Sequence, residues 1–162
     1  MLVKDQITTL NIAILQGIKK GSIKLYGLAE TIRKGESTII AEAGSDEQIG
    51  IDSEFDAVVW HRLIDSTNSL YDGRGKTNEY IGTYRVRLVC YSKDICFSDY
   101  LTATIAKSNQ RKPLRTNYNK QQTIQQEIPE ALRNFDIDSY FFTIDYEVKG
   151  VISPICLNDF CF

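Results

Sequence analysis

Two segments that lie far apart in this chain alternate apolar and polar residues in the way that β-strands do. In segment 80–92 one face is apolar, and Arg85 and Arg87 lie on the other face. In segment 140–148 the apolar face is again continuous. The apolar residues are Tyr84, Val86, Leu88 and Cys90 in the first segment, and Phe142, Ile144, Tyr146 and Val148 in the second. Two strands of this kind predict a sheet with at least one apolar face, which other elements must cover.

Two helices are predicted to provide that cover. Over residues 5–20, apolar side chains recur at steps of three and four, which places them in one stripe on a helix. Asp5 can cap its start, and Gly21 follows its end. A second helix is predicted over 98–109, with Ser98 as its N-cap. The apolar stripes consist of Ile7, Leu10, Ile14 and Ile18 in the first helix, and Leu101 and Ile105 in the second.

Further strands are predicted over 23–26, 37–41 and 55–63, and a long loop follows them. The polar segment 110–126, which contains Pro113, is predicted to be a mobile loop. This order predicts an α+β fold: an antiparallel sheet with two main helices packed on one face, in a single domain over residues 1–162. A doubly wound nucleotide-binding fold is disfavoured, because no series of βα units is present.

The composition agrees with a globular protein and excludes several classes. The chain has 162 residues, of which 43% are hydrophobic and 25% charged, enough for a sizeable core. Its net charge of -2 disfavours general binding to nucleic acid or anionic membranes. It contains no apolar run of the ~20 residues that span a bilayer, and no secretory signal pattern at Met1–Asp5. We therefore expect a protein made in a reducing cytoplasm, without a membrane partner.

The four cysteines do not have the spacing of a metal or redox site. They are Cys90, Cys96, Cys156 and Cys161, and neither a zinc-ribbon pattern nor a C-x-x-C motif occurs among them. We expect reduced thiols, no metal and no cofactor.

Three patterns could carry chemistry, and each has a simpler interpretation. His61 is the only histidine, so it could act as a general base, but sequence places no partner beside it. Asp52, Glu54 and Asp56 alternate on a predicted strand and could bind Ca²⁺, yet the loop signature for calcium is absent. Gly75-Lys76-Thr77 ends like a phosphate-binding loop but lacks the earlier glycine. A structural histidine, a solvated strand face and a hairpin tip are favoured.

Charge is segregated along the chain. Between Lys34 and Arg62 the charged residues are all acidic, and between Asp99 and Glu127 they are all basic. Two solvated loops would explain this pattern. Head-to-tail association of copies, with acidic surface against basic surface, would also explain it. A third account places the basic segment on nucleic-acid phosphates, but Tyr118 is its only aromatic residue, so DNA contact is not favoured. The acidic set is Glu36, Glu42, Asp46, Glu47, Asp52, Glu54 and Asp56, and the basic set is Lys107, Arg111, Lys112, Arg115 and Lys120.

The segment 155–162 is unusually apolar. It contains Ile155, Leu157, Phe160 and Phe162. The segment either completes the core or forms part of a subunit contact.

The order of elements resembles that of the tail-terminator and tail-completion proteins of long-tailed bacteriophages. The acidic segment and the glutamine-rich segment 120–127 have no counterpart in that family. The segments that carry the resemblance are the helix over 7–18, the strand over 84–91, the helix over 98–109 and the strand over 141–148.

The resemblance implies a homohexameric ring in the virion that caps the tail tube and joins it to the head connector. Its partners would be further copies of the chain and other tail or neck proteins, and it has no catalytic residues. We therefore expect a non-enzymatic structural protein. Two rivals stay open: a ligand-binding or enzymatic domain that uses His61 with the Asp52, Glu54 and Asp56 carboxylates, and an adaptor that binds DNA or protein through residues 107–120.

Overall fold

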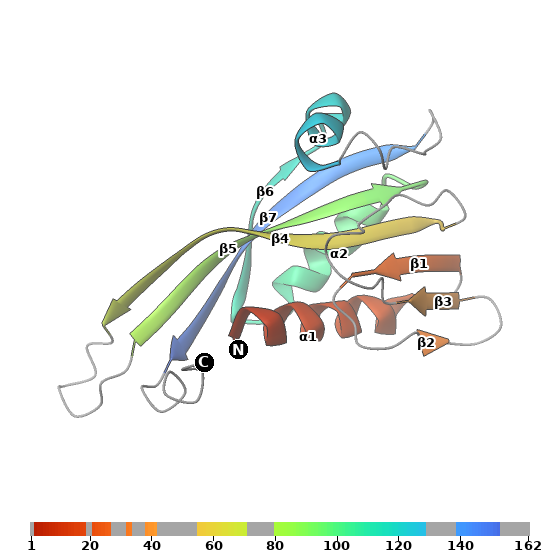
Figure 1. Cartoon of the computed structure of the whole chain (residues 1–162). Coiled ribbons are helices and arrows are strands. Elements are labelled where there is room, and N and C mark those ends of the chain that lie inside the picture. The colour runs from red at the N-terminus through yellow and green to blue at the C-terminus, as the bar shows by residue number, and fades with distance from the viewer. Residues whose placement is uncertain are drawn as a thin grey trace.

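The computed structural model of the chain describes residues 2–18, 21–26, 32–33, 38–41, 55–70, 80–128 and 139–152. Within these ranges the strands are β1 (Gly21–Leu25), β2 (Ile32–Arg33), β3 (Thr38–Ala41), β4 (Ala57–Leu70), β5 (Tyr80–Ser92), β6 (Arg111–Asn117) and β7 (Tyr140–Ile152). They form one sheet in the order β2-β3-β1-β4-β5-β7-β6 (Figure 1).

Most neighbouring strands are antiparallel, as the sequence predicts. β5 pairs with β4 on one side and with β7 on the other along its whole length, and β6 adds to the outer side of β7. The strand β1 differs, because it runs parallel to both of its neighbours, β3 and β4. A parallel pair needs a crossover connection instead of a tight hairpin. The sheet is therefore mixed and mostly antiparallel.

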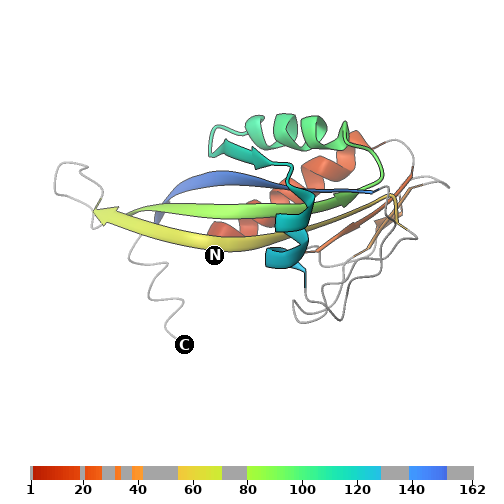
Figure 2. The ribbon, with the colours of Figure 1, turned by 90° about the horizontal axis from the view of Figure 1, so that it is seen from above.

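Two helices cover one face of this sheet, as expected. They are α1 (Leu2–Gly17) and α2 (Phe97–Ala106), and they lie side by side on the same side of the strands (Figures 1 and 2). Leu10 of α1 and Leu101 of α2 are fully buried against strand residues such as Leu88 and Ile144. The predicted α+β fold is thus confirmed, and its main core lies between the sheet and these two helices.

A smaller core lies on the opposite face of the sheet, beneath the helix α3 (Lys120–Glu127). Because strand side chains alternate between faces, Trp60, Tyr91 and Phe141 point away from the main core. Ile128, directly after α3, packs on these three aromatic residues and is buried with them.

The helix boundaries differ from those predicted. α1 begins at Leu2, so Asp5 lies inside the helix instead of capping it. The N-cap of α2 is Cys96, whose backbone N–H donates to Oδ1 of Asp94 at 2.9 Å. Ser98 is buried in the first turn, where its hydroxyl donates to the carbonyl of Ile95. The N-cap of α2 makes no side-chain capping hydrogen bond, and Ser98 lies inside the helix instead of capping it.

The predicted mobile loop over 110–126 is wrong, because this segment contains β6 and α3. Pro113 is compatible with β6, since the strand lies at the sheet edge and a register shift falls between Pro113 and Arg115. Asn119 caps α3 by accepting a hydrogen bond from Gln122 N. Both elements have polar sequences because β6 is an edge strand and α3 buries mainly polar side chains, those of Thr123 and Glu127.

The strands β4, β5 and β7 continue beyond the helices as a three-stranded arm (Figure 1). β4 extends to Leu70, past the predicted strand end at Leu63, and a bulge between Leu63 and Asp65 marks the base of the arm. β7 continues past Val148, where the predicted strand ends, and Gly150 pairs with Gly82 of β5. We call the paired residues 65–70, 80–85 and 147–152 the arm.

Candidate functional site

The five basic residues singled out from the sequence fall into three different environments. Lys107, at the C-cap of α2, and Lys112 and Arg115, on β6, are exposed. Lys112 and Arg115 lie opposite Glu147 and Asp145 of β7. We call the three exposed bases the basic edge. Lys120 is partly buried instead.

Lys120 has a structural role at the start of α3. Its Nζ donates to the carbonyl of Ser139 at 2.7 Å and lies 5.8 Å from the centre of the Phe141 ring. These contacts attach α3 to the beginning of β7.

The sequence placed Arg111 with the exposed bases, but the structure buries it. Arg111 is 6% exposed, and its Nε and Nη1 atoms have no hydrogen-bond partner among the described residues. It pairs with Val148 of β7, so its side chain points to the face that carries the main core. Burial lowers the pKa of Arg111, an effect that Tyr146 partly opposes. Arg111 is therefore an interior cation and not part of the basic edge.

Of the predicted acidic surface, the structure describes only Asp56. Its Oδ2 accepts a hydrogen bond from Ser22 N at 3.0 Å, which joins the start of β4 to β1. The remaining acidic residues lie outside the described ranges: Glu36, Glu42, Asp46, Glu47, Asp52 and Glu54.

His61 lies beneath α1 in a chain of polar contacts. Its Nε2 is 3.0 Å from Oδ1 of Asn11, and its Nδ1 is 3.2 Å from the Tyr146 hydroxyl. Burial, with a smaller contribution from the Arg111 charge, lowers the pKa of His61 to about 3. The imidazole is therefore neutral at physiological pH.

The structure does not bring His61 and the predicted carboxylates together. His61 and Asp56 are five residues apart on an extended segment, a separation of roughly 16 Å at the rise of a β-strand. The side chain of His61 points towards α1, while Asp56 lies beside Ser22 at the end of the sheet. Asp52 and Glu54 lie outside the described ranges. His61 and Asp56 therefore lie in two separate places and do not form the predicted acid–base site.

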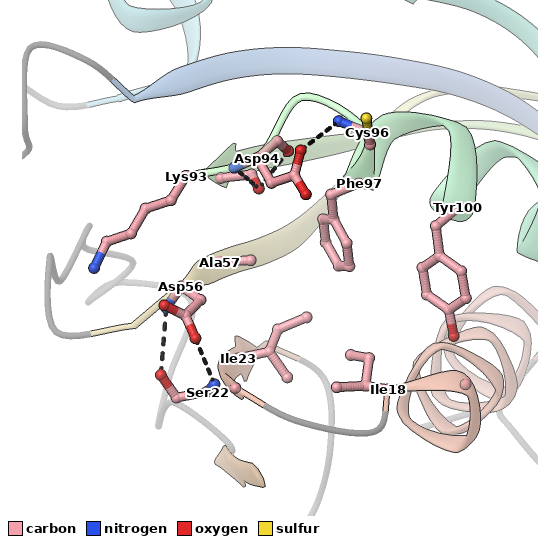
Figure 3. A pocket seen from close by; sticks show the side chains of 13 residues that line it. Ile18, Ser22, Ile23, Asp56, Ala57, Lys93, Asp94, Cys96, Phe97 and Tyr100 are labelled. Atoms are coloured by element: carbon pink, nitrogen blue, oxygen red, sulfur yellow. Dashed lines mark hydrogen bonds between the residues drawn. The ribbon is translucent and has the colours of Figure 1, made fainter. Parts of the chain in front are cut away.

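One cavity was not predicted from the sequence. It has a volume of about 680 Å³ and lies where the end of α1, the starts of β1 and β4, and the turn into α2 meet (Figure 3). Phe97 and Tyr100 project from α2 towards Ile18 and Ile23 (Figure 3). The rings of Phe97 and Tyr100 stack at 5.7 Å between centroids. The cavity therefore has an apolar floor.

Polar residues surround this apolar floor. Asp56 is held by Ser22, and Asp94 accepts the backbone N–H of Cys96. Lys93 and the exposed thiol of Cys96 also line the cavity. Sequence reasoning missed the site because separate segments of the chain form it. The one local signal was Phe97 beside Ser98, which we interpreted only as a helix start.

A second polar site joins α3 to the open face of the sheet. Arg62 donates to Glu127 through Nε and Nη2 at 2.8 and 2.6 Å, and Arg87 Nη1 donates to the same carboxylate at 3.0 Å. Arg87 also donates through Nε to Asp145 at 2.8 Å, and these bonds raise its pKa. The Glu127 side chain is 2% exposed. This network is a structural clamp between α3 and β4, β5 and β7.

Within the described ranges, no three His, Cys, Asp or Glu side chains gather as metal ligands would. No helix described there combines the length and apolarity needed to cross a bilayer. The sequence matches no protein-family model and no curated protein.

Proposed function

We propose that this protein is a structural component of a phage or phage-like particle, and that it works by assembling with copies of itself into a ring at the tail end or the head–tail neck. The proposal combines the resemblance in element order with one feature of the fold, the arm.

The arm carries the proposal. Among the residues whose burial the structure describes, the fully buried ones of the main core reach Val86 in β5 and Val148 in β7, and Tyr84 packs partly against them. Both strands stay paired as far as Tyr80 and Ile152. A strand ribbon that leaves its own core needs another apolar surface to be stable. A neighbouring copy in a ring would supply that surface.

The basic edge supports contact between unlike surfaces of two copies. Lys107 is exposed at the end of α2, and Lys112 and Arg115 are exposed on the edge strand β6. A heterologous contact with an acidic surface of the next copy generates a closed ring when the rotation allows. The exposed Leu114, between Lys112 and Arg115, would add apolar area to the same contact.

Under this proposal the partners are further copies, six in the complete ring, together with other tail or neck proteins. The protein would be made in the host cytoplasm and act in the virion. Its function would require no catalytic residue and no cofactor.

The geometry favours this proposal over the ligand-binding or enzymatic rival. His61 donates and accepts hydrogen bonds within the fold, and it is not among the residues that line the cavity of about 680 Å³. The DNA-binding or protein-binding adaptor would use the same basic edge. It predicts a salt-sensitive mobility shift with DNA, or a complex with another protein, while the chain itself stays monomeric.

The arm can be tested by shortening it. Asp65 and Arg85 are cross-strand neighbours, so residues 66–84 can be replaced by an Asn-Gly turn of the kind that closes hairpins. We expect the unaltered chain to form closed rings in electron micrographs and the shortened chain to be a folded monomer. Circular dichroism and the urea unfolding midpoint show whether the core is retained. Rings formed by the shortened chain, or an unaltered chain that stays monomeric, would contradict the proposal.

A further inference from the structure

The cavity of about 680 Å³ lies within a single copy of the chain. Its walls come from α1, α2, β1 and β4, and none of its described lining residues belongs to the basic edge or to the arm (Figure 3). Its volume falls within the range of about 300–1,000 Å³ that is typical of small-molecule sites. The cavity is therefore a candidate binding site that is separate from the proposed assembly surfaces.

The aromatic wall of the cavity is held in place by contacts within the fold. Tyr100 Oη donates a hydrogen bond to the carbonyl of Ile14 in α1 at 2.6 Å. Gly17 allows this close approach, because a Cβ added there would collide with the Tyr100 hydroxyl. Phe97, from the same helix, stacks on the Tyr100 ring. A preformed wall of this kind spares a ligand the cost of ordering it.

The charged side chains at the cavity favour a positive ligand. Among the described residues that line it, Asp56 and Asp94 are acidic and only Lys93 is basic. Lys93 extends away from Phe97 and Tyr100, whereas Asp94 lies beside Phe97 (Figure 3). The faces of aromatic rings also attract cations. A positive group at Phe97 would therefore meet both a ring and a carboxylate.

The two helix ends at the cavity agree with this sign of charge. Gly17 is the last residue of α1 and lines the cavity, so the negative end of that helix dipole lies there. The start of α2 would attract an anion through its free N–H groups. The N–H groups of Cys96 and Phe97 both donate to Asp94, to its side chain and its carbonyl respectively, so they are already occupied.

We infer that this cavity binds a small organic ammonium ion whose body is aromatic or branched aliphatic. The apolar body lies between Phe97 and Ile23, and the ammonium group lies between the Phe97 ring and the Asp94 carboxylate. The inference goes beyond the proposed function, because it needs neither the arm nor the basic edge.

Two probes of matched shape and opposite charge test the inference. They are 2-phenylethylammonium and 3-phenylpropionate, which both carry a phenyl ring on a short alkyl chain. Isothermal titration calorimetry at pH 7 and low salt measures the binding of each probe to the full-length protein. We expect a dissociation constant of about 1 mM or lower for the ammonium ion, which is within reach for a ligand of this size. The carboxylate should bind at least about tenfold more weakly, because it would meet like charge.

Matched variants locate the ammonium group. Asp94→Asn keeps an oxygen that can accept the Cys96 N–H but removes the charge, and it should weaken binding of the ammonium probe about fivefold. Asp99→Asn removes the same charge from the first turn of α2, at an exposed residue that does not line the cavity, and should leave binding unchanged. Phe97→Leu keeps an apolar side chain but removes the ring, and should weaken binding about threefold. Circular dichroism shows whether each variant is folded.

The outcomes separate this inference from the proposed function. Equal affinity for the two probes, equal effects of Asp94→Asn and Asp99→Asn, or no binding of the ammonium probe at about 10 mM would overturn the inference. Rings that fail to bind the ammonium probe would contradict this inference and leave the ring proposal intact. A monomeric chain that binds it as expected would support the binding site and contradict the proposed function instead.

Discussion

The Tyr146 hydroxyl lies 3.2 Å from Nδ1 of His61 and donates a hydrogen bond to it. This direction follows from the next two contacts. Asn11 Nδ2 donates to the carbonyl of Tyr26 at 2.9 Å, so Oδ1 of Asn11 faces His61 Nε2 as an acceptor. His61 therefore carries its proton on Nε2, and Nδ1 accepts. Burial raises the pKa of Tyr146, which keeps the phenol protonated as the donor.

The first prediction concerns the dependence of stability on pH. The pKa of His61 is about 3 in the folded protein and about 6.5 in the unfolded chain, so the unfolded state binds the extra proton first. The contribution of neutral His61 to the free energy of unfolding is fully present above pH 6.5, and it is lost as the pH falls towards 3. Between pH 7 and pH 5 the free energy of unfolding should fall by about 2 kcal/mol. Urea unfolding at both pH values measures the change.

The control for this prediction is His61→Gln. His61 is the only histidine in the chain, so the variant should lose most of the dependence between pH 7 and pH 5. An unaltered chain with equal stability at both pH values would show that His61 is not held neutral beneath α1.

The second prediction concerns Glu127, which is buried between Arg62 and Arg87. Glu127→Ala leaves two guanidinium groups without their shared partner and should lower the free energy of unfolding by about 3 kcal/mol. Arg85→Ala is the matched control, because the Arg85–Asp65 pair is 3.8 Å apart and half exposed. That variant should cost less than about 1 kcal/mol. Equal losses in the two variants would contradict the clamp.

The third prediction concerns the glycine that begins β1. Gly21 has a φ of 97°, and a Cβ added there would lie 2.7 Å from Oδ2 of Asp56. Gly21→Ala should therefore lower the free energy of unfolding by about 1–3 kcal/mol, through backbone strain and through loss of the Asp56–Ser22 bond. The double variant with Asp56→Ala removes the clash and keeps the strain. Full recovery in the double variant would show that the backbone conformation is not the cause.

The sequence predicted the parts of the fold whose signals are local. The apolar stripe around Leu10 and the alternation through Leu88 and Ile144 each set a buried face within one segment, and all three residues are buried. Hydrophobic periodicity specifies such elements without knowledge of their neighbours.

The parts that the sequence did not predict depend on pairing between distant segments. β6 and α3 have polar sequences, because an edge strand and an exposed helix bury little. Arg111 is buried because its partner Val148 sets the face to which it points. The cavity combines Ile18, Asp56 and Phe97 from three separate segments, so no spacing in the sequence could reveal it.

The fourth prediction concerns the basic edge. Reversing its charge with Lys107→Glu, Lys112→Glu and Arg115→Glu should prevent assembly and leave the subunit folded, because like charges would then meet across the contact. Replacing the same three residues with glutamine should weaken assembly to a smaller degree and reduce its dependence on salt. Sedimentation velocity at low and high salt measures both effects. Unchanged assembly of the charge-reversed variant would exclude the basic edge from the contact.

The most direct measurement of the central claim is the native mass of the unaltered full-length protein in solution, determined by mass spectrometry under non-denaturing conditions. A closed ring predicts one dominant species near six times the 18.4 kDa subunit mass. A single species at the subunit mass itself, across the concentration range, would contradict the claim that this protein acts by assembling with copies of itself.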